Sequence, residues 1–208
     1  LSIDYKIREG KVYKEIINQA KYTDASLIIM GTHGVSGFEE MWIGSNAYKV
    51  VAASDCPVIS IRYDTHKPYI KKIVMPLDTT KETLYKVPFT IKMAKYFNAE
   101  IHLIACNTTK LKDMKDKTDK TANKVIELLK KNNINYTKTS IQNSNIANAV
   151  IEYAKNVEAD IIAITTEENG PIFSFIIGST AQSIINHSPI PVLSIRVNDP
   201  NKLKELKI

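Results

Sequence analysis

The chain has 208 residues and a net charge of +6, with 44% hydrophobic and 24% charged residues. These values are typical of a globular protein with a buried core, and they exclude a disordered, collagen-like or disulfide-scaffold protein. No apolar run approaches the roughly 20 residues that a membrane helix needs.

The first part of the chain predicts a strand, a helix and two further strands. We expect strands at Ser2–Arg8, Ser26–Met30 and Cys56–Arg62, because these segments match later segments of the chain that also predict strands. Residues 12–21 predict a helix, since Tyr13, Ile16, Ile17 and Ala20 recur at helical spacing.

The rest of the chain predicts five strands that alternate with four helices. The expected strands are Ile70–Met75, Glu100–Cys106, Ile134–Ile141, Ala159–Thr165 and Val192–Val197. The expected helices are Leu84–Ala94, kinked or delayed by Pro88, and Asn123–Lys131, Ile146–Ala154 and Ser179–Asn186. This alternation implies an α/β fold, in which a doubly wound parallel sheet carries helices on both faces.

An internal repeat with an offset of 134 residues relates the two parts, and it aligns residues 24–62 with 158–196 without a gap. The identical positions include Gly44, Ser45, Pro57, Val58 and Ser60, which match Gly178, Ser179, Pro191, Val192 and Ser194. The repeat predicts that residues 1–66 are the C-terminal half of a first unit, that 67–199 are a complete second unit, and that 200–208 are a tail.

A glycine-rich segment lies between two predicted elements of the first unit. Gly31, Gly34 and Gly37 follow a strand, and nine residues separate Gly34 from Gly44-Ser45, which opens a helix. Glycines alone would indicate a tight loop, but backbone N–H groups at such a loop and helix start attract phosphate, and the added Gly44-Ser45 favours phosphate binding. The spacing differs from that of a P-loop, a dinucleotide fingerprint and a hydrolase nucleophile elbow.

Residues 28–62, IIMGTHGVSGFEEMWIGSNAYKVVAASDCPVISIR, resemble the C-terminal signature of the universal stress proteins. The resemblance implies a five-stranded sheet in the order 3-2-1-4-5 and a cytoplasmic role in the stress response. It also implies a bound adenine nucleotide such as ATP, with Mg²⁺ or without it, although an empty site is allowed. Family members form dimers or tandem pseudo-dimers through their fifth strands, and binding rather than catalysis is expected, with weak nucleotide hydrolysis at most.

By position, the resemblance assigns phosphate and ribose binding to Gly31, Gly34, Gly44 and Ser45, with Asn46 beside them. A weaker site in the second unit would comprise Pro76, Leu77, Asp78, Thr79, Gly178, Ser179 and Thr180. Thr165 and Glu168 stand where the first unit has Gly31 and Gly34, and Glu167 lies between them. Because acidic side chains repel a triphosphate, the second site is expected to be degenerate. Asp78 could equally be a turn or helix cap.

Other functions receive less support from the residues. A dimerisation or interaction module without nucleotide is the main alternative. An adenylyl-transferring enzyme would need an activating lysine beside the loop, and a phospho-accepting receiver would need an acidic cluster around Asp78; we find neither. The scattered histidines (His33, His66, His102 and His187) disfavour a metal site.

The residue types also bear on partners and cellular location. Almost all basic residues are lysines, interleaved with acids as in residues 110–120, which disfavours nucleic-acid and membrane partners. Cys56 and Cys106 lie in apolar runs, which favours reduced core cysteines in the cytoplasm.

The half unit raises an expectation about assembly. The strand Ser2–Arg8 lacks its neighbour in the order 3-2-1-4-5, and residue 1 is Leu rather than Met. We therefore expect residues 1–62 to be completed by another chain or to belong to a processed or longer protein. Pro57–Arg62 and Pro191–Val197 are expected to pair antiparallel, in a homodimer or a tandem pseudo-dimer.

Overall fold

The computed structural model describes residues 2–32, 43–62, 68–166 and 177–197. Its helices are α1 (Val12–Tyr22), α2 (Ser45–Ala53), η1 (a 3₁₀ turn, Glu82–Leu84), α3 (Val87–Phe97), α4 (Lys112–Lys131), α5 (Ile146–Asn156) and α6 (Ser179–His187). Its strands are β1 (Ile28–Gly31), β2 (Val58–Ile61), β3 (Lys72–Leu77), β4 (Glu100–Asn107), β5 (Tyr136–Gln142), β6 (Ile161–Thr166) and β7 (Val192–Arg196).

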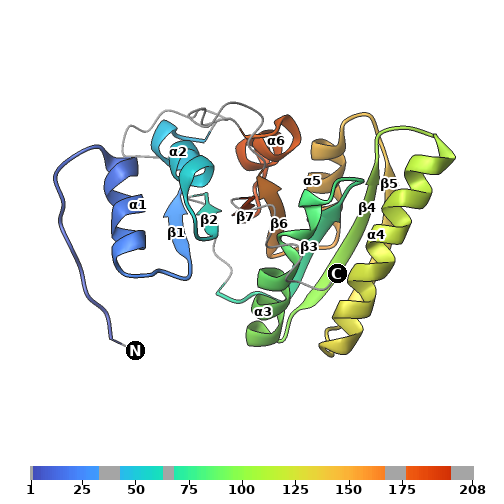
Figure 1. Ribbon diagram of the computed structural model, residues 1–208, viewed down its shortest axis with the longest axis horizontal. Helices are drawn as coiled ribbons and strands as arrows, with labels where there is room; N and C mark the ends of the chain where they lie inside the picture. Colours follow the sequence, from blue (N-terminus) through green and yellow to red (C-terminus); the bar gives the residue numbers. More distant parts are fainter. Residues whose placement is uncertain (1, 33–42, 63–67, 167–176, 198–208) are drawn as a thin grey trace.

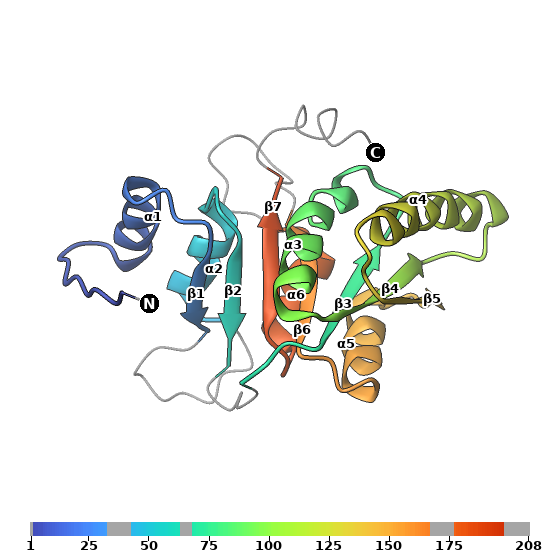
Figure 2. The same cartoon turned by 90° about the horizontal axis from the view of Figure 1, so that it is seen from below.

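The seven strands form one sheet in the order β1-β2-β7-β6-β3-β4-β5. All neighbouring strands run parallel except β2 and β7, whose opposed arrows are visible in Figure 2. Numbered within the second unit alone, its strands have the order 3-2-1-4-5. The predicted α/β fold with a doubly wound, mostly parallel sheet is therefore confirmed.

The antiparallel pair β2–β7 joins the two repeated segments of this chain. Val58, Ile59 and Ser60 lie opposite Ser194, Leu193 and Val192. Arg196 adds hydrogen bonds from Nη1 to the carbonyl oxygen of Ala53 at 3.2 Å and to Asp55 Oδ1 at 3.3 Å. The antiparallel pairing expected between Pro57–Arg62 and Pro191–Val197 is present within the chain, whereas a homodimer of two chains stays a prediction.

Helices cover the sheet on both faces because successive strand residues point to opposite sides. Ile73 and Met75 of β3 pack with α3 and α4, while Val74 packs in a second core with α2, α5 and α6. Figure 1 shows α2, α6 and α5 on one side of the sheet and α3 on the other. The alternation of apolar side chains within β3 thus supplies both cores.

The first unit buries its elements less completely than the second. Ile29 of β1 is 62% exposed, whereas Ala163, its counterpart 134 residues later, is fully buried beneath α3 and α4. No residue of α1 is fully buried, although Val150 and Ala154 of the equivalent helix α5 are. Ile29 is exposed because the described part of the first unit has no helix corresponding to α3 or α4. Helix α1 packs on the other face, where the described part of the first unit has no strand corresponding to β4 or β5, both of which contact α5.

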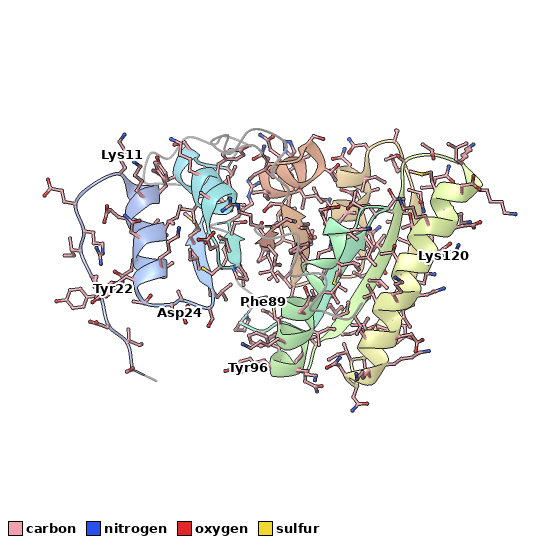
Figure 3. The ribbon with its side chains drawn as sticks, viewed as in Figure 1. Lys11, Tyr22, Asp24, Phe89, Tyr96 and Lys120 are labelled. Carbon is pink, nitrogen blue, oxygen red and sulfur yellow. The ribbon has the colours of Figure 1, made fainter. Side chains whose placement is uncertain are left out.

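The predicted strand Ser2–Arg8 is wrong, because residues 2–9 form no strand and are exposed. Its counterpart β5 is held by β4, and the described residues of the first unit contain no equivalent of β4. Backbone groups without a partner strand stay in water. The segment instead makes local contacts, such as Lys6 Nζ 5.5 Å from the ring centre of Tyr22, whose side chain points outward in Figure 3.

Several boundaries also differ from the expected ones. The strand β3 continues through Pro76, which lies opposite Ile104 of β4, and ends at Leu77. Helix α3 begins at Val87, so Pro88 falls in its first turn and delays the helix as expected. Helix α4 begins at Lys112 rather than Asn123, because the lysine-rich segment forms its solvated first half.

Candidate functional site

A cavity of about 240 Å³ lies in the second unit at the carboxyl ends of β3, β4 and β6, where open α/β sheets bind ligands. Its lining residues are Pro76, Leu77, Asp78, Thr80, Thr83, Lys86, Cys106, Ile146, Ile164, Thr165, Gly178, Ser179, Thr180, Ala181 and Ile184. The cavity combines apolar walls with a few polar groups, which is the usual make-up of a small-molecule site.

The structure brings together the second-site residues that the sequence singled out. Pro76, Leu77, Asp78, Gly178, Ser179 and Thr180 all line this cavity. Thr79 lines a neighbouring cavity of about 260 Å³, which shares Asp78, Thr80 and Cys106 with the first. The sheet end and the start of α6 therefore meet although about 100 residues separate them in the chain.

Asp78 shapes the turn that follows β3. Its Oδ1 accepts hydrogen bonds from the backbone N–H of Thr80 at 2.7 Å and from Thr80 Oγ1 at 2.6 Å. Asp78 in turn donates its backbone N–H to Thr83 Oγ1 at 3.3 Å. The carboxylate thus caps a turn, as one interpretation of the sequence held, and it lines the cavity as well.

Lys86 is the site residue that sequence reasoning missed. It is only 3% exposed, and its Nζ donates to Thr83 Oγ1 at 2.9 Å and to Thr165 Oγ1 at 3.3 Å. The apolar positions around it predicted a helix, but nothing in that spacing marked a lysine as buried. The sequence indicates no lysine beside the glycine loop of the first unit, whereas Lys86 lines the cavity of the second unit.

Cys106 contributes an inert thiol to the same cavity. Burial raises its pKa from 9.0 to about 12, and the opposing charges of Lys86 and Asp78 have smaller effects. The thiol is therefore protonated at neutral pH and is not a nucleophile. Both cysteines are free, and Cys106 is the more buried of the two.

Cys106 should lower the free energy of unfolding at alkaline pH. Above pH 9 the unfolded chain loses the thiol proton that the folded chain keeps up to about pH 12. This stability is complete below pH 9 and declines by about 1.4 kcal/mol per pH unit above it. Urea denaturation at pH 8 and pH 10.5 should show the advantage of the wild type over Cys106→Ala shrinking by about 2 kcal/mol. An unchanged difference between the two proteins would contradict the assignment.

The glycine loop of the first unit is described only in part. Gly31 ends β1, Gly44 precedes α2, and Ser45 and Asn46 open that helix in exposed positions. The backbone N–H of Gly44 donates to the carbonyl oxygen of Thr32 at 2.7 Å. The other loop positions singled out above (His33, Gly34, Gly37, Glu167 and Glu168) lie outside the described residues, as does His66.

Gly44 is required by a close approach of two backbones. A Cβ atom at this position would lie 2.9 Å from the carbonyl oxygen of Thr32, which is closer than real Cβ contacts allow. We expect Gly44→Ala to lower the free energy of unfolding by about 1–3 kcal/mol. The control Ser45→Ala, at an exposed position, should change it by less than about 0.5 kcal/mol. Equal effects in denaturant titrations would count against this explanation.

Each unit fixes the helix start of the other. The backbone N–H of Ile43, next to Gly44, donates to Asn186 Oδ1 of α6 at 3.3 Å. The backbone N–H of Ile177, next to Gly178, donates to Tyr48 Oη of α2 at 3.3 Å. The two glycine-serine helix starts are thus positioned by reciprocal contacts across the junction between the units.

Other site types find little support in the part of the chain that is described. There, no three His, Cys, Asp or Glu residues gather as a metal site would require. Burial lowers the pKa of His102, whose Nδ1 lies 3.1 Å from Tyr153 Oη. None of the described helices is long and apolar enough to cross a membrane.

The structure is a doubly wound α/β fold with a mostly parallel sheet and a cavity at the strand ends. The model of the universal stress protein family matches residues 2–62 and 70–196. The chain therefore belongs to the universal stress protein family.

Individual relatives agree with this family. Universal stress protein YxiE of Bacillus subtilis is 45% identical over 53 residues, which is 26% of this chain and 36% of that protein. A universal stress protein structure from Archaeoglobus fulgidus has a TM-score of 0.68 at 22% identity and covers 88% of this chain and 64% of its own. Another universal stress protein structure from that organism, in complex with dAMP, has a TM-score of 0.50 at 15% identity and covers 62% of this chain and 99% of its own. These structures show the shared fold.

Proposed function

We propose that this chain is a stress-response protein that binds an adenine nucleotide and turns it over weakly at most. The observation that carries the proposal is the cavity at the strand ends, which joins the Asp78 turn to the helix start Gly178–Thr180. A helix start offers free N–H groups and the positive end of a dipole to a phosphate. The dAMP complex of a family member supports the ligand class.

We place the nucleoside in the second unit, although the sequence alone favoured the first. β6 pairs with β3, and residues of both strands line the cavity. Among the described strands, its counterpart β1 pairs only with β2 and lies at the edge of the sheet. The loop with Gly31, Gly34, Gly44 and Ser45 is proposed as a further phosphate site that needs another segment to complete it.

Calorimetric titration of the purified chain with AMP and with ATP, each with and without Mg²⁺, tests this proposal. Thr180→Trp places a bulky side chain at the exposed rim of the cavity, and Asn46→Trp is the matched change 134 residues earlier. We expect binding to the wild type and to Asn46→Trp but not to Thr180→Trp. The reverse pattern would place the site in the first unit, and no heat with any nucleotide would refute nucleotide binding.

An interaction module is the second candidate, and the exposed first unit favours it. Ile29 is 62% exposed on a sheet face that is fully buried at Ala163 of the second unit. Sedimentation velocity over a range of concentrations tests this candidate. Association that Ile29→Lys abolishes would support it, and a monomer at every concentration would count against self-association through this face.

We also propose that the protein is cytoplasmic. Free Cys56 and Cys106 are consistent with a cytoplasmic setting, where thiols are kept reduced.

A further inference from the structure

We infer that Lys86 makes the second-unit cavity selective for a nucleoside monophosphate over the uncharged nucleoside. This inference rests on the proposed function, since it assigns the ligand's phosphate to a particular side chain. It concerns a residue outside the glycine-serine signature, and it arises from a difference between the two units.

The two units differ at the last turn of the strand that leads into the loop. The first unit has Gly31 at the end of β1, and the second has Thr165 near the end of β6. Thr165 Oγ1 accepts a hydrogen bond from Lys86 Nζ at 3.3 Å, and Thr83 Oγ1 accepts another at 2.9 Å. The hydroxyl of Thr165 therefore helps to hold the ammonium group of Lys86. Its counterpart in the first unit, Gly31, has no side chain that could do so.

Lys86 supplies positive charge to the wall of the cavity. Its side chain lines the cavity at 3% exposure, together with Gly178, Ser179 and Thr180 at the start of α6. Water is largely excluded around a group so deeply buried, so its attraction for an anion is stronger than at the surface. An ammonium group donates charge-assisted hydrogen bonds to phosphate oxygens.

The other ionisable groups of the cavity leave this role to Lys86. Asp78 directs Oδ1 to Thr80, and as a carboxylate it suits hydroxyl or amino donors of a ligand rather than a phosphate. Cys106 is protonated, because burial raises its pKa to about 12. Lys86 is therefore the cationic side chain among the lining residues.

The size of the cavity points to a small phosphate ligand. Its volume of about 240 Å³ lies below the roughly 300–1,000 Å³ of common ligand pockets. AMP and adenosine are thus the informative pair of probes, since they differ only in the phosphate.

The test compares AMP with adenosine on the whole chain, by calorimetry, for the wild type, Lys86→Met and Lys86→Arg. The wild type should bind AMP more tightly than adenosine. Lys86→Met should lower the affinity for AMP by about 10- to 100-fold, which is the effect of losing a hydrogen bond to a charged group. The same variant should change the affinity for adenosine by no more than about threefold. Lys86→Arg should keep much of the preference for AMP over adenosine, because it keeps the positive charge. Circular dichroism verifies the fold of each variant.

The outcomes separate the inference from the proposed function. A wild type that binds AMP and adenosine equally, or a folded Lys86→Met that keeps the AMP preference, would overturn the role of Lys86 while nucleotide binding stands. A wild type that binds neither would refute both. If Lys86→Met does not fold, Lys86→Gln is the second variant, because its amide can still reach the hydroxyls of Thr83 and Thr165. The same loss of AMP preference is then expected.

Discussion

Leu193→Ala should lower the free energy of unfolding by about 2–5 kcal/mol, as expected for a large buried side chain that leaves a cavity. Leu193 is fully buried in β7, opposite Ile59 of the first unit and beside Ala163 of the second. Its side chain belongs to the core that also contains Ile59 and Ile73. The mutation therefore removes apolar contact at the junction of the two units, and urea denaturation followed by circular dichroism measures it.

Ile29→Ala is the control for this prediction. Ile29 also lies in the sheet but is 62% exposed, so its truncation should cost less than about 1 kcal/mol. If Ile29→Ala costs as much as Leu193→Ala, or if Leu193→Ala costs less than about 1 kcal/mol, the continuous core across β2 and β7 is contradicted.

Asp160→Ala should cost about 2–4 kcal/mol, because it leaves two backbone donors without their acceptor. Asp160 is 6% exposed, and its Oδ2 accepts from the N–H groups of Lys71 at 2.7 Å and Lys72 at 2.9 Å. Its own N–H donates to the carbonyl oxygen of Lys72 at 2.9 Å. These bonds set the register between β3 and β6, the strands whose other ends line the cavity.

Asp160→Asn separates the hydrogen bonds from the charge. The amide keeps an acceptor oxygen at the same place, so we expect roughly half of the loss seen with alanine. Thermal or urea unfolding of the three proteins provides the comparison. An alanine variant as stable as the wild type would show that Asp160 does not hold β3 in place.

Much of the fold could be predicted from the repeat. Its second copy contains all five strands, and the repeated Pro-Val-x-Ser-Ile-Arg segments marked β2 and β7 as equivalent edges. The repeat predicted a strand at Ser2–Arg8, because Ile3-Asp4-Tyr5 matches Ile134-Asn135-Tyr136, but the segment forms none. A strand depends on its neighbour, and no local pattern records whether the neighbour is present.

The candidate site could be predicted only where local sequence carries it. Asp78 at a strand end and Gly178-Ser179 at a helix start are local signals, and both line the cavity. Lys86 is a different case, since lysine is mostly an exposed residue. Its partner Thr165 lies 79 positions later, so only the folded sheet brings the two together.

Detection of bound nucleotide is the most direct test of the claim that the second-unit cavity binds an adenine nucleotide. The full chain should be purified without added nucleotide, analysed by native mass spectrometry, and then titrated with AMP in parallel with Thr180→Trp and Asn46→Trp. We predict one AMP per chain for the wild type and for Asn46→Trp, and none for Thr180→Trp. A wild type that carries no nucleotide and gains none on titration with AMP or ATP would contradict the account.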